Sequence, residues 1–139
     1  MNIIANTLFT LMQRYRVTIR DAINANELGL NAMHVQCLHI IANNIDCTAN
    51  DIVVKMQRDK AQIARLVKEL INLSLLVKKA SETDKRRFVL SFTVEGTTLY
   101  TKLLKAEQTI NDKMCKDLTT QQITDFLAIA QQINNNMQR

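Results

Sequence analysis

The sequence predicts a mainly α-helical protein with one small β-hairpin wing: a winged helix-turn-helix joined to a helical dimerisation region. Three observations predict this fold class. Pro is absent and Gly occurs only twice in 139 residues, which favours long uninterrupted helices. Apolar residues recur at steps of three and four through most of the chain. Only the end of the middle third departs from this pattern, where Phe88 to Phe92 is rich in β-branched and aromatic residues.

The first third of the chain predicts two helices. Residues 2–26 carry one apolar stripe at helical spacing, namely Ile4, Leu8, Leu11, Tyr15, Ile19 and Ala22. Gly29 is expected near the C-terminal cap of this helix. Asn31 is expected to cap a second helix that ends near Asn43. The expected inner face of that helix is Met33, Cys37, Leu38, Ile41 and Ala42.

The next segment predicts a helix-turn-helix. Thr48 and Asp51 form a capping pattern before a short helix with Ile52, Val53 and Met56 on its inner face. Asp59 and Gln62 have the spacing of a second cap with a reciprocal acceptor at its third position. The helix they open, residues 60–72, is expected to face the core with Ile63, Leu66, Val67 and Leu70. Two short helices joined by a turn of three or four residues form this motif.

A β-hairpin and two further helices are predicted for the remainder. Residues 75–79 and 88–92 read as strands that flank a charged turn at residues 81–87. Thr93 is expected to cap a long helix, and Thr119 with Gln122 forms a capping box before the last one. The two apolar stripes are Leu99, Leu103, Ala106, Ile110 and Met114, then Ile123, Phe126, Leu127, Ala130, Ile133 and Met137.

These elements predict a single domain over residues 1–139, because no linker is long enough to separate domains. The winged helix-turn-helix is expected at 47–92, and dimerisation helices at 2–26 and 93–138. Amphipathic helices of that length at both ends of the chain lack an obvious local partner. An apolar stripe must be buried, and the same helices of a second copy are the simplest partner, so we expect a homodimer.

Charge is concentrated in the segment from Lys55 to Arg87. It holds ten basic and four acidic residues, a net charge of +6, whereas the whole chain carries +5. A concentrated basic segment is typical of a phosphate-binding surface, although a solvated basic face is the plain alternative.

Several function classes are disfavoured by what the chain lacks. The three cysteines are odd in number and form no closely spaced pair, which favours a reducing compartment. No secretory signal or membrane-spanning run is present, so we expect a cytoplasmic protein without a membrane role. His34 and His39 point about 140° apart on one helix, a poor metal geometry. Without a recognisable catalytic motif, we expect neither an enzyme nor a cofactor or metal.

The chain resembles the MarR family of bacterial winged-helix regulators over nearly its whole length. The most specific part of the resemblance runs from Thr48 to Gly96. Its pieces are Asp59-Lys60, Arg65 to Val67, Leu70, Leu75 to Val77, the wing Asp84 to Arg86, Ser91 to Gly96, and Leu118 to Gln122. Order and spacing together carry the resemblance. Ser74 departs from it, because Gly usually follows the recognition helix, where a left-handed backbone is often required.

Residues 60–72 are the expected recognition helix, which would enter the major groove of DNA. On its exposed face we expect Lys60, Ala61, Gln62, Arg65 and Lys68. Gln62 is suited to bidentate contact with adenine and Arg65 to guanine, each contributing roughly 1–3 kcal/mol of discrimination. Solvated helix residues are the alternative for the same side chains.

The wing is expected to contact DNA with Asp84, Lys85, Arg86 and Arg87. The resemblance implies that Arg86 enters the minor groove and that Asp84 orients it. Arg87, with Lys78 and Lys79, suits phosphate contacts. A plain charged turn is the alternative.

The predicted function is therefore a sequence-specific transcriptional regulator, a repressor in our interpretation, that binds a pseudo-palindrome in double-stranded DNA as a homodimer. The resemblance also implies a small-molecule effector, with Tyr15, Arg16, Met33, His34 and Cys37 as candidate pocket residues. Cys37 is equally a plain core residue. The competing hypothesis is a winged-helix protein-interaction module that lacks sequence-specific DNA binding.

Overall fold

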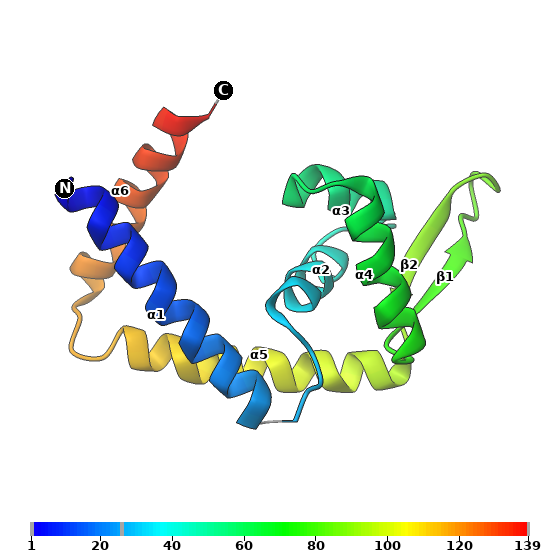
Figure 1. Ribbon diagram of the computed structural model, residues 1–139, viewed down its shortest axis with the longest axis horizontal. Helices are drawn as coiled ribbons and strands as arrows, with labels where there is room; N and C mark the ends of the chain where they lie inside the picture. Colours follow the sequence, from blue (N-terminus) through cyan, green and yellow to red (C-terminus); the bar gives the residue numbers. More distant parts are fainter. Residues whose placement is uncertain (1, 26, 139) are drawn as a thin grey trace. The chain divides into compact units, whose positions relative to one another are not determined.

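The computed structural model describes residues 2–25 and 27–138, and within them it contains six helices and one two-stranded antiparallel sheet (Figure 1). The elements in order are α1 (Ile3–Ala25), α2 (Ala32–Ala42), α3 (Ala49–Met56), α4 (Lys60–Asn72), β1 (Leu76–Ala80), β2 (Phe88–Phe92), α5 (Val94–Met114) and α6 (Thr120–Met137). The chain divides into two compact units within α5, one ending at Ala106 and the other beginning at Glu107.

The predicted fold class is confirmed, and the predicted helices are all present. The end of α1 differs in detail from the prediction. Glu27, with φ of 53°, takes the left-handed position after the helix, and the N–H of Leu28 bonds back to the carbonyl of Ile23 at 3.2 Å. Gly29 is also left-handed, with φ of 67°, but it lies further along the connection to α2. Position 26, the predicted last residue of the helix, lies outside the described residues.

Helix α1 exposes most of its predicted stripe. Ile4 is 62%, Leu8 44% and Leu11 52% exposed, whereas Ile19 near the other end of the helix is 8% exposed. The first part of α1 therefore has an apolar face that its own compact unit leaves uncovered.

The core of the first unit is built around α2, which contacts α1, α3 and α4. Its buried residues are His34, Val35, Cys37, Leu38 and Ile41. The prediction of a single inner face is wrong here, because Ala42 is exposed and Val35 and His34 are buried. A helix with neighbours on three sides buries more than one stripe. In contrast, the predicted core residues of α4, namely Ile63, Leu66, Val67 and Leu70, are all buried.

The hairpin lies beside α4, and β1 contacts that helix (Figure 1). Leu76 pairs with Phe92 at one end of the sheet and Ala80 with Phe88 at the other. The N–H of Leu90 donates to the carbonyl of Cys47 at 2.8 Å, which joins β2 to the segment before α3.

A junction of backbone contacts fixes the end of α4, the start of β1 and the start of α5. Ser74 has φ of 61°, its N–H bonds the carbonyl of Ile71, and the N–H of Leu75 bonds that of Leu70. This is a Schellman motif, and Ser74 adopts the left-handed backbone at the position where Gly is usual. Thr93 Oγ1 donates to the carbonyl of Ser74 at 2.6 Å and accepts from the N–H of Gly96 at 2.9 Å, so Thr93 caps α5 as expected.

The second unit contains the end of α5 and helix α6. The predicted capping box is confirmed: Thr119 Oγ1 accepts from the N–H of Gln122 at 3.1 Å, and the Gln122 side chain accepts from the N–H of Thr119 at 2.8 Å. Helix α6 buries no described residue, and Phe126, Leu127 and Ile129 are 58 to 60% exposed. This unit too presents an uncovered apolar face.

Candidate nucleic-acid interface

Helix α4 presents the residues predicted to read DNA. With four apolar residues turned into the core, its opposite side leaves Lys60, Ala61, Arg65 and Lys68 exposed and Gln62 half-buried. Three residues separate α3 from α4, and Gln57 among them is left-handed with φ of 51°, which sharpens the turn. The five predicted residues of α4 thus lie on or beside one solvent-facing side of a short, well-anchored helix.

The N-terminus of α4 differs from the predicted capping pattern. Asp59 Oδ1 accepts from the N–H of Ala61 at 3.0 Å, but Gln62 does not reach back to form a capping box. The Asp59 carboxylate is stabilised where the partial positive charge of the helix end is largest. The Gln62 amide is therefore not used to close the cap, which leaves its donor and acceptor for other partners.

Arg65 is part of a chain of contacts that the sequence did not predict. Arg65 Nε lies 3.8 Å from Glu69 Oε1, one helical turn away, and Glu69 Oε2 lies 2.6 Å from His34 Nε2 on α2. His34 is only 7% exposed. Its Nδ1 accepts from the N–H of Asn31 at 3.2 Å, and its own N–H donates to Asn31 Oδ1 at 2.9 Å. His34 thus closes the α2 capping box. The three-residue spacing from Asn31 to His34 in the sequence could have indicated this box.

The hairpin turn is ordered by its own polar groups. The N–H of Ser81 donates to the carbonyl of Arg87 at 2.7 Å and closes the turn. Asp84 Oδ1 accepts from the backbone N–H of Arg86 at 3.0 Å. Asp84 therefore fixes the backbone that carries Arg86 rather than its guanidinium, which differs from the contact that the resemblance implied. Asp84, Lys85, Arg86 and Arg87 are all exposed.

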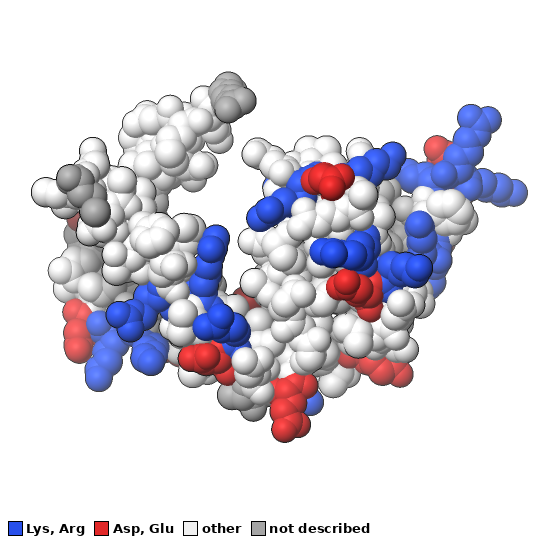
Figure 2. Space-filling model, in the orientation of Figure 1, with Lys and Arg blue, Asp and Glu red and all other residues white. Residues whose placement is uncertain are grey.

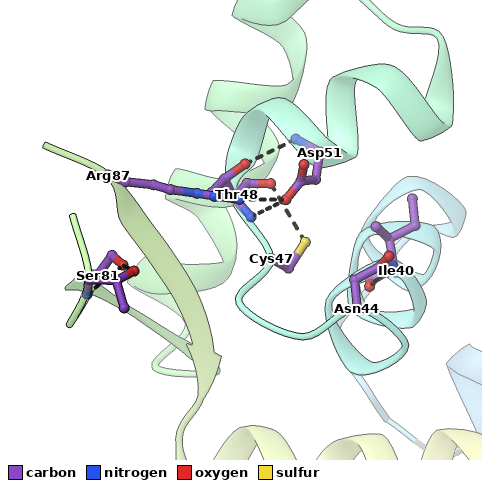
Figure 3. A network of polar contacts seen from close by, with 8 residues as sticks. Ile40, Asn44, Cys47, Thr48, Asp51, Ser81 and Arg87 are labelled. Atoms are coloured by element: carbon purple, nitrogen blue, oxygen red, sulfur yellow. Dashed lines mark hydrogen bonds and ion pairs between the residues drawn. The ribbon is translucent and has the colours of Figure 1, made fainter.

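An ion pair links the hairpin to the helix-turn-helix (Figure 3). Arg87 Nη2 lies 3.7 Å from Asp51 Oδ2, and the same Asp51 oxygen accepts from the N–H of Thr48 at 2.9 Å in the capping box of α3. The hydrogen bond from the Thr48 backbone is the main cause that lowers the pKa of Asp51, and the charges of Arg87 and Lys55 lower it further. Arg87 therefore has a structural partner in addition to any phosphate contact.

Basic side chains gather over α4 and the hairpin (Figure 2). The exposed basic residues of these elements are Lys60, Arg65, Lys68, Lys78, Lys79, Lys85, Arg86 and Arg87. Lys78 Nζ lies 5.4 Å from the centre of the Phe88 ring across the strand pair, which holds the ammonium close to the sheet. The predicted recognition residues and the basic hairpin thus belong to one compact unit.

The predicted effector residues lie in different surroundings. Tyr15 and Arg16 are exposed on α1, Met33 is half-buried, and His34 and Cys37 are buried. Burial raises the pKa of the Cys37 thiol to about 11, and its Sγ lies 3.8 Å from Met56 Sδ, which fits a core residue. A cavity of about 300 Å³ is present between the segment after α1 and the start of α5. Its lining contains none of the five and comprises Glu27, Leu28, Val94, Glu95, Thr98, Leu99 and Lys102. The effector residues stay a prediction.

Other site classes find little support in the part of the chain that the structure describes. No group of three His, Cys, Asp or Glu side chains is placed to hold a metal ion. The two histidines have separate partners, since His39 Nδ1 lies 2.8 Å from the hydroxyl of Tyr100. Among the described helices, none has the length and apolarity needed to span a membrane.

The helix-turn-helix, the adjoining hairpin and the flanking helices define a winged helix-turn-helix protein. The model of the MarR family matches residues 28–87, which include α2, α3, α4 and the hairpin turn. Residues 28–87 of this chain therefore match the MarR family model, and the resemblance predicted from the sequence is confirmed.

Known proteins agree with this assignment. A curated relative from Thauera aromatica, a putative transcriptional regulatory protein for the hcr operon, is 32% identical over 69 residues. That alignment covers 50% of this chain and 42% of the relative, so it spans less than half of that protein.

Two solved structures show the same fold. Staphylococcus aureus MarR, in complex with salicylate and kanamycin, has a TM-score of 0.85 at 19% identity, and the match covers 96% of this chain and 89% of that one. CouR from Rhodococcus jostii, bound to p-coumaroyl-CoA, has a TM-score of 0.82 at 18% identity, with coverage of 95% and 92%.

Proposed function

We propose that this protein is a transcriptional repressor that binds a pseudo-palindromic operator in double-stranded DNA as a homodimer. The observation that carries the proposal is the shared surface of α4 and the hairpin. There an exposed helix face with Gln62 and Arg65 lies in the same compact unit as a hairpin whose turn displays Arg86. A helix of this kind fits the major groove, and an arginine-tipped hairpin fits the adjacent minor groove. Such a role is non-enzymatic and fits a cytoplasmic location.

Charge supports the same proposal. The segment from Lys55 to Arg87 carries a net +6, and the structure leaves its basic residues on α4 and the hairpin exposed. Each phosphate neutralised by such a residue releases condensed counterions, so binding must weaken steeply with salt. The phosphate contacts would set the position of the protein, and Gln62 and Arg65 would read the bases.

Dimerisation is supported by the uncovered apolar faces of α1 and α6. Residues such as Ile4 and Phe126, each about 60% exposed, have no cover within their own compact units. Contact with the same helices of a second copy would bury both faces and give the two-fold symmetry that a palindromic operator requires.

Effector control is part of the proposal. Two proteins of this fold are described with small organic molecules bound, salicylate in one and p-coumaroyl-CoA in the other. We propose that this protein also responds to a small-molecule effector, which would shift an equilibrium between conformations that differ in DNA affinity.

The test is selection of duplexes from a random DNA library by the purified protein, followed by fluorescence anisotropy on the selected duplex at two salt concentrations. We expect a palindrome, binding that weakens with salt, and a further loss of affinity in Arg86→Ala. Lys116→Ala is the matched control, because it removes one exposed positive charge from the turn between α5 and α6. A folded dimer that selects no sequence would refute the proposal and favour the protein-interaction module.

A further inference from the structure

The contacts between α2 and α4 place a buried histidine behind the residue expected to read guanine. Glu69 bridges the two helices, with one carboxylate oxygen 2.6 Å from His34 Nε2 and the other 3.8 Å from Arg65 Nε. We propose that Glu69, held by His34, is a positioning residue that fixes the Arg65 guanidinium for base reading and so determines specificity at one base pair per half-site. This proposal rests on the proposed function.

The hydrogen-bond roles of the histidine follow from its neighbours. The backbone N–H of Asn31 is only a donor, and it points at His34 Nδ1 at 3.2 Å, so that nitrogen must be unprotonated. The ring proton therefore lies on Nε2 and is donated to Glu69 Oε2. At 2.6 Å this is a short, charge-assisted hydrogen bond, and burial of the imidazole protects it from water. One carboxylate oxygen of Glu69 is thereby fixed.

The pair between Arg65 and Glu69 has little effect alone. Their side chains are 69% and 42% exposed, and an exposed ion pair one helical turn apart contributes little to stability. The ion pair matters because it orients the Arg65 side chain. Because the His34 bond fixes the carboxylate, the guanidinium is guided to one region of the helix surface before DNA arrives. Bidentate pairing with guanine needs such a defined orientation, and preorganisation lowers the entropy lost on binding.

The negative charge of Glu69 argues against a role in general affinity. A carboxylate on a helix face that approaches DNA phosphates weakens binding to every sequence. Glu69 lowers the affinity for every DNA sequence but orients Arg65, so its expected effect is on the discrimination between bases at the position that Arg65 reads. This separates Glu69 from the surrounding lysines, whose removal would weaken binding evenly across sequences.

The experiment uses Glu69→Gln and His34→Gln in the full-length protein. In the first variant the carbonyl of the new side-chain amide still accepts from His34, but the amide nitrogen cannot accept from Arg65. In the second, Gln is an ordinary partner in a capping box, so it retains the Asn31 cap and loses the bond to Glu69. Glu82→Gln is the matched control, because it removes the same charge from the exposed hairpin turn rather than from α4.

The readout is relative affinity for every single-base variant of the duplex selected by the wild type, with Arg65→Ala marking the base pair that Arg65 reads. We expect both variants to lose preference at that base pair by at least about fivefold, the low end of one bidentate contact. Glu82→Gln should keep the preference. In an Arg65→Ala background, Glu69→Gln should cause no further change at that position.

Three results would overturn the inference in distinguishable ways. Unchanged preference in Glu69→Gln would show that Arg65 needs no positioning, while the proposed function stands. A loss spread over all positions, together with a lower unfolding midpoint, would show that the pair only supports the fold. A wild type that selects no duplex would refute the proposed function, and this inference with it.

Discussion

Replacement of Gly96 by Ala sets helix propensity against packing, and the structure predicts that packing wins. Gly96 is the third residue of α5, where Ala would gain up to about 1 kcal/mol from its better helix propensity. A Cβ at this position, however, would lie 2.0 Å from the carbonyl oxygen of Leu75 and 2.9 Å from its carbonyl carbon. The obstacle is backbone, so no side chain can rotate away from it.

The size of the expected stability loss follows from how far α5 and the α4–β1 turn must move apart. Nonbonded carbons are in optimal contact at about 3.5–4.0 Å, so α5 and the α4–β1 turn must part by an ångström or more. That movement also strains the bonds from Thr93 to the carbonyls of Leu75, at 3.1 Å, and Ser74, at 2.6 Å. Overpacking costs about 1–3 kcal/mol, and each weakened hydrogen bond about 0.5–1.5 kcal/mol. After the gain in propensity, we expect a net loss of about 1–5 kcal/mol.

The assay is urea unfolding followed by circular dichroism at one fixed protein concentration, since a dimer's stability depends on concentration. Thr97→Ala, at the next and exposed position, is the matched control and should stay within about 0.5 kcal/mol of the wild type. A Gly96→Ala protein as stable as the wild type would refute the close approach of α5 to the turn.

Three further perturbations test other parts of the structure. Ser74→Gly should stabilise the protein by up to about 1 kcal/mol in the same assay, because Ser74 is left-handed; a loss of stability would contradict that backbone. A thiol reagent at mildly alkaline pH should label half-buried Cys115 before Cys37 and Cys47, whose burial raises their pKa values, and mass spectrometry would show the reverse order if this is wrong. Asp51→Asn should be less stable than the wild type at neutral pH. Because folding lowers the pKa of Asp51, this difference should shrink as pH falls below about 5, and a constant difference would contradict it.

Local patterns predicted local structure well. Asn31 and Thr48 were predicted as N-caps and Thr119 with Gln122 as a capping box, and each of the three caps forms a capping box in the structure. The core positions of α4 were identified from apolar residues at steps of three and four. The helix buries one side, and these residues all lie on it. These features depend on residues three or four apart, so a single sequence contains the information.

Contacts between elements were not predictable in the same way. Glu69 reads as an exposed helix residue, and only the packing of α4 on α2 brings it to His34. Asp51 reads as a cap, and only the return of β2 brings Arg87 to it. Gln62 has the spacing of a cap partner but does not serve as one. Pairs of residues far apart in the sequence can be identified only once the fold is known, because the residues next to one partner in the sequence do not indicate the other partner.

The backbone junction at residues 74–75 and 93–96 fixes the geometry of the surface formed by α4 and the hairpin. It joins the end of α4 to β1 through a left-handed residue, and it joins both to α5 through the Thr93 hydroxyl, which is bonded on two sides. Helix α4 and the hairpin therefore cannot turn independently of α5 without breaking backbone contacts. If DNA affinity depends on how far apart two such surfaces lie in a dimer, α5 is the element through which a change in spacing must reach them. Gly96→Ala should thus weaken binding to the selected duplex even where the variant stays folded, and unaltered affinity in a destabilised variant would show that the junction serves stability alone.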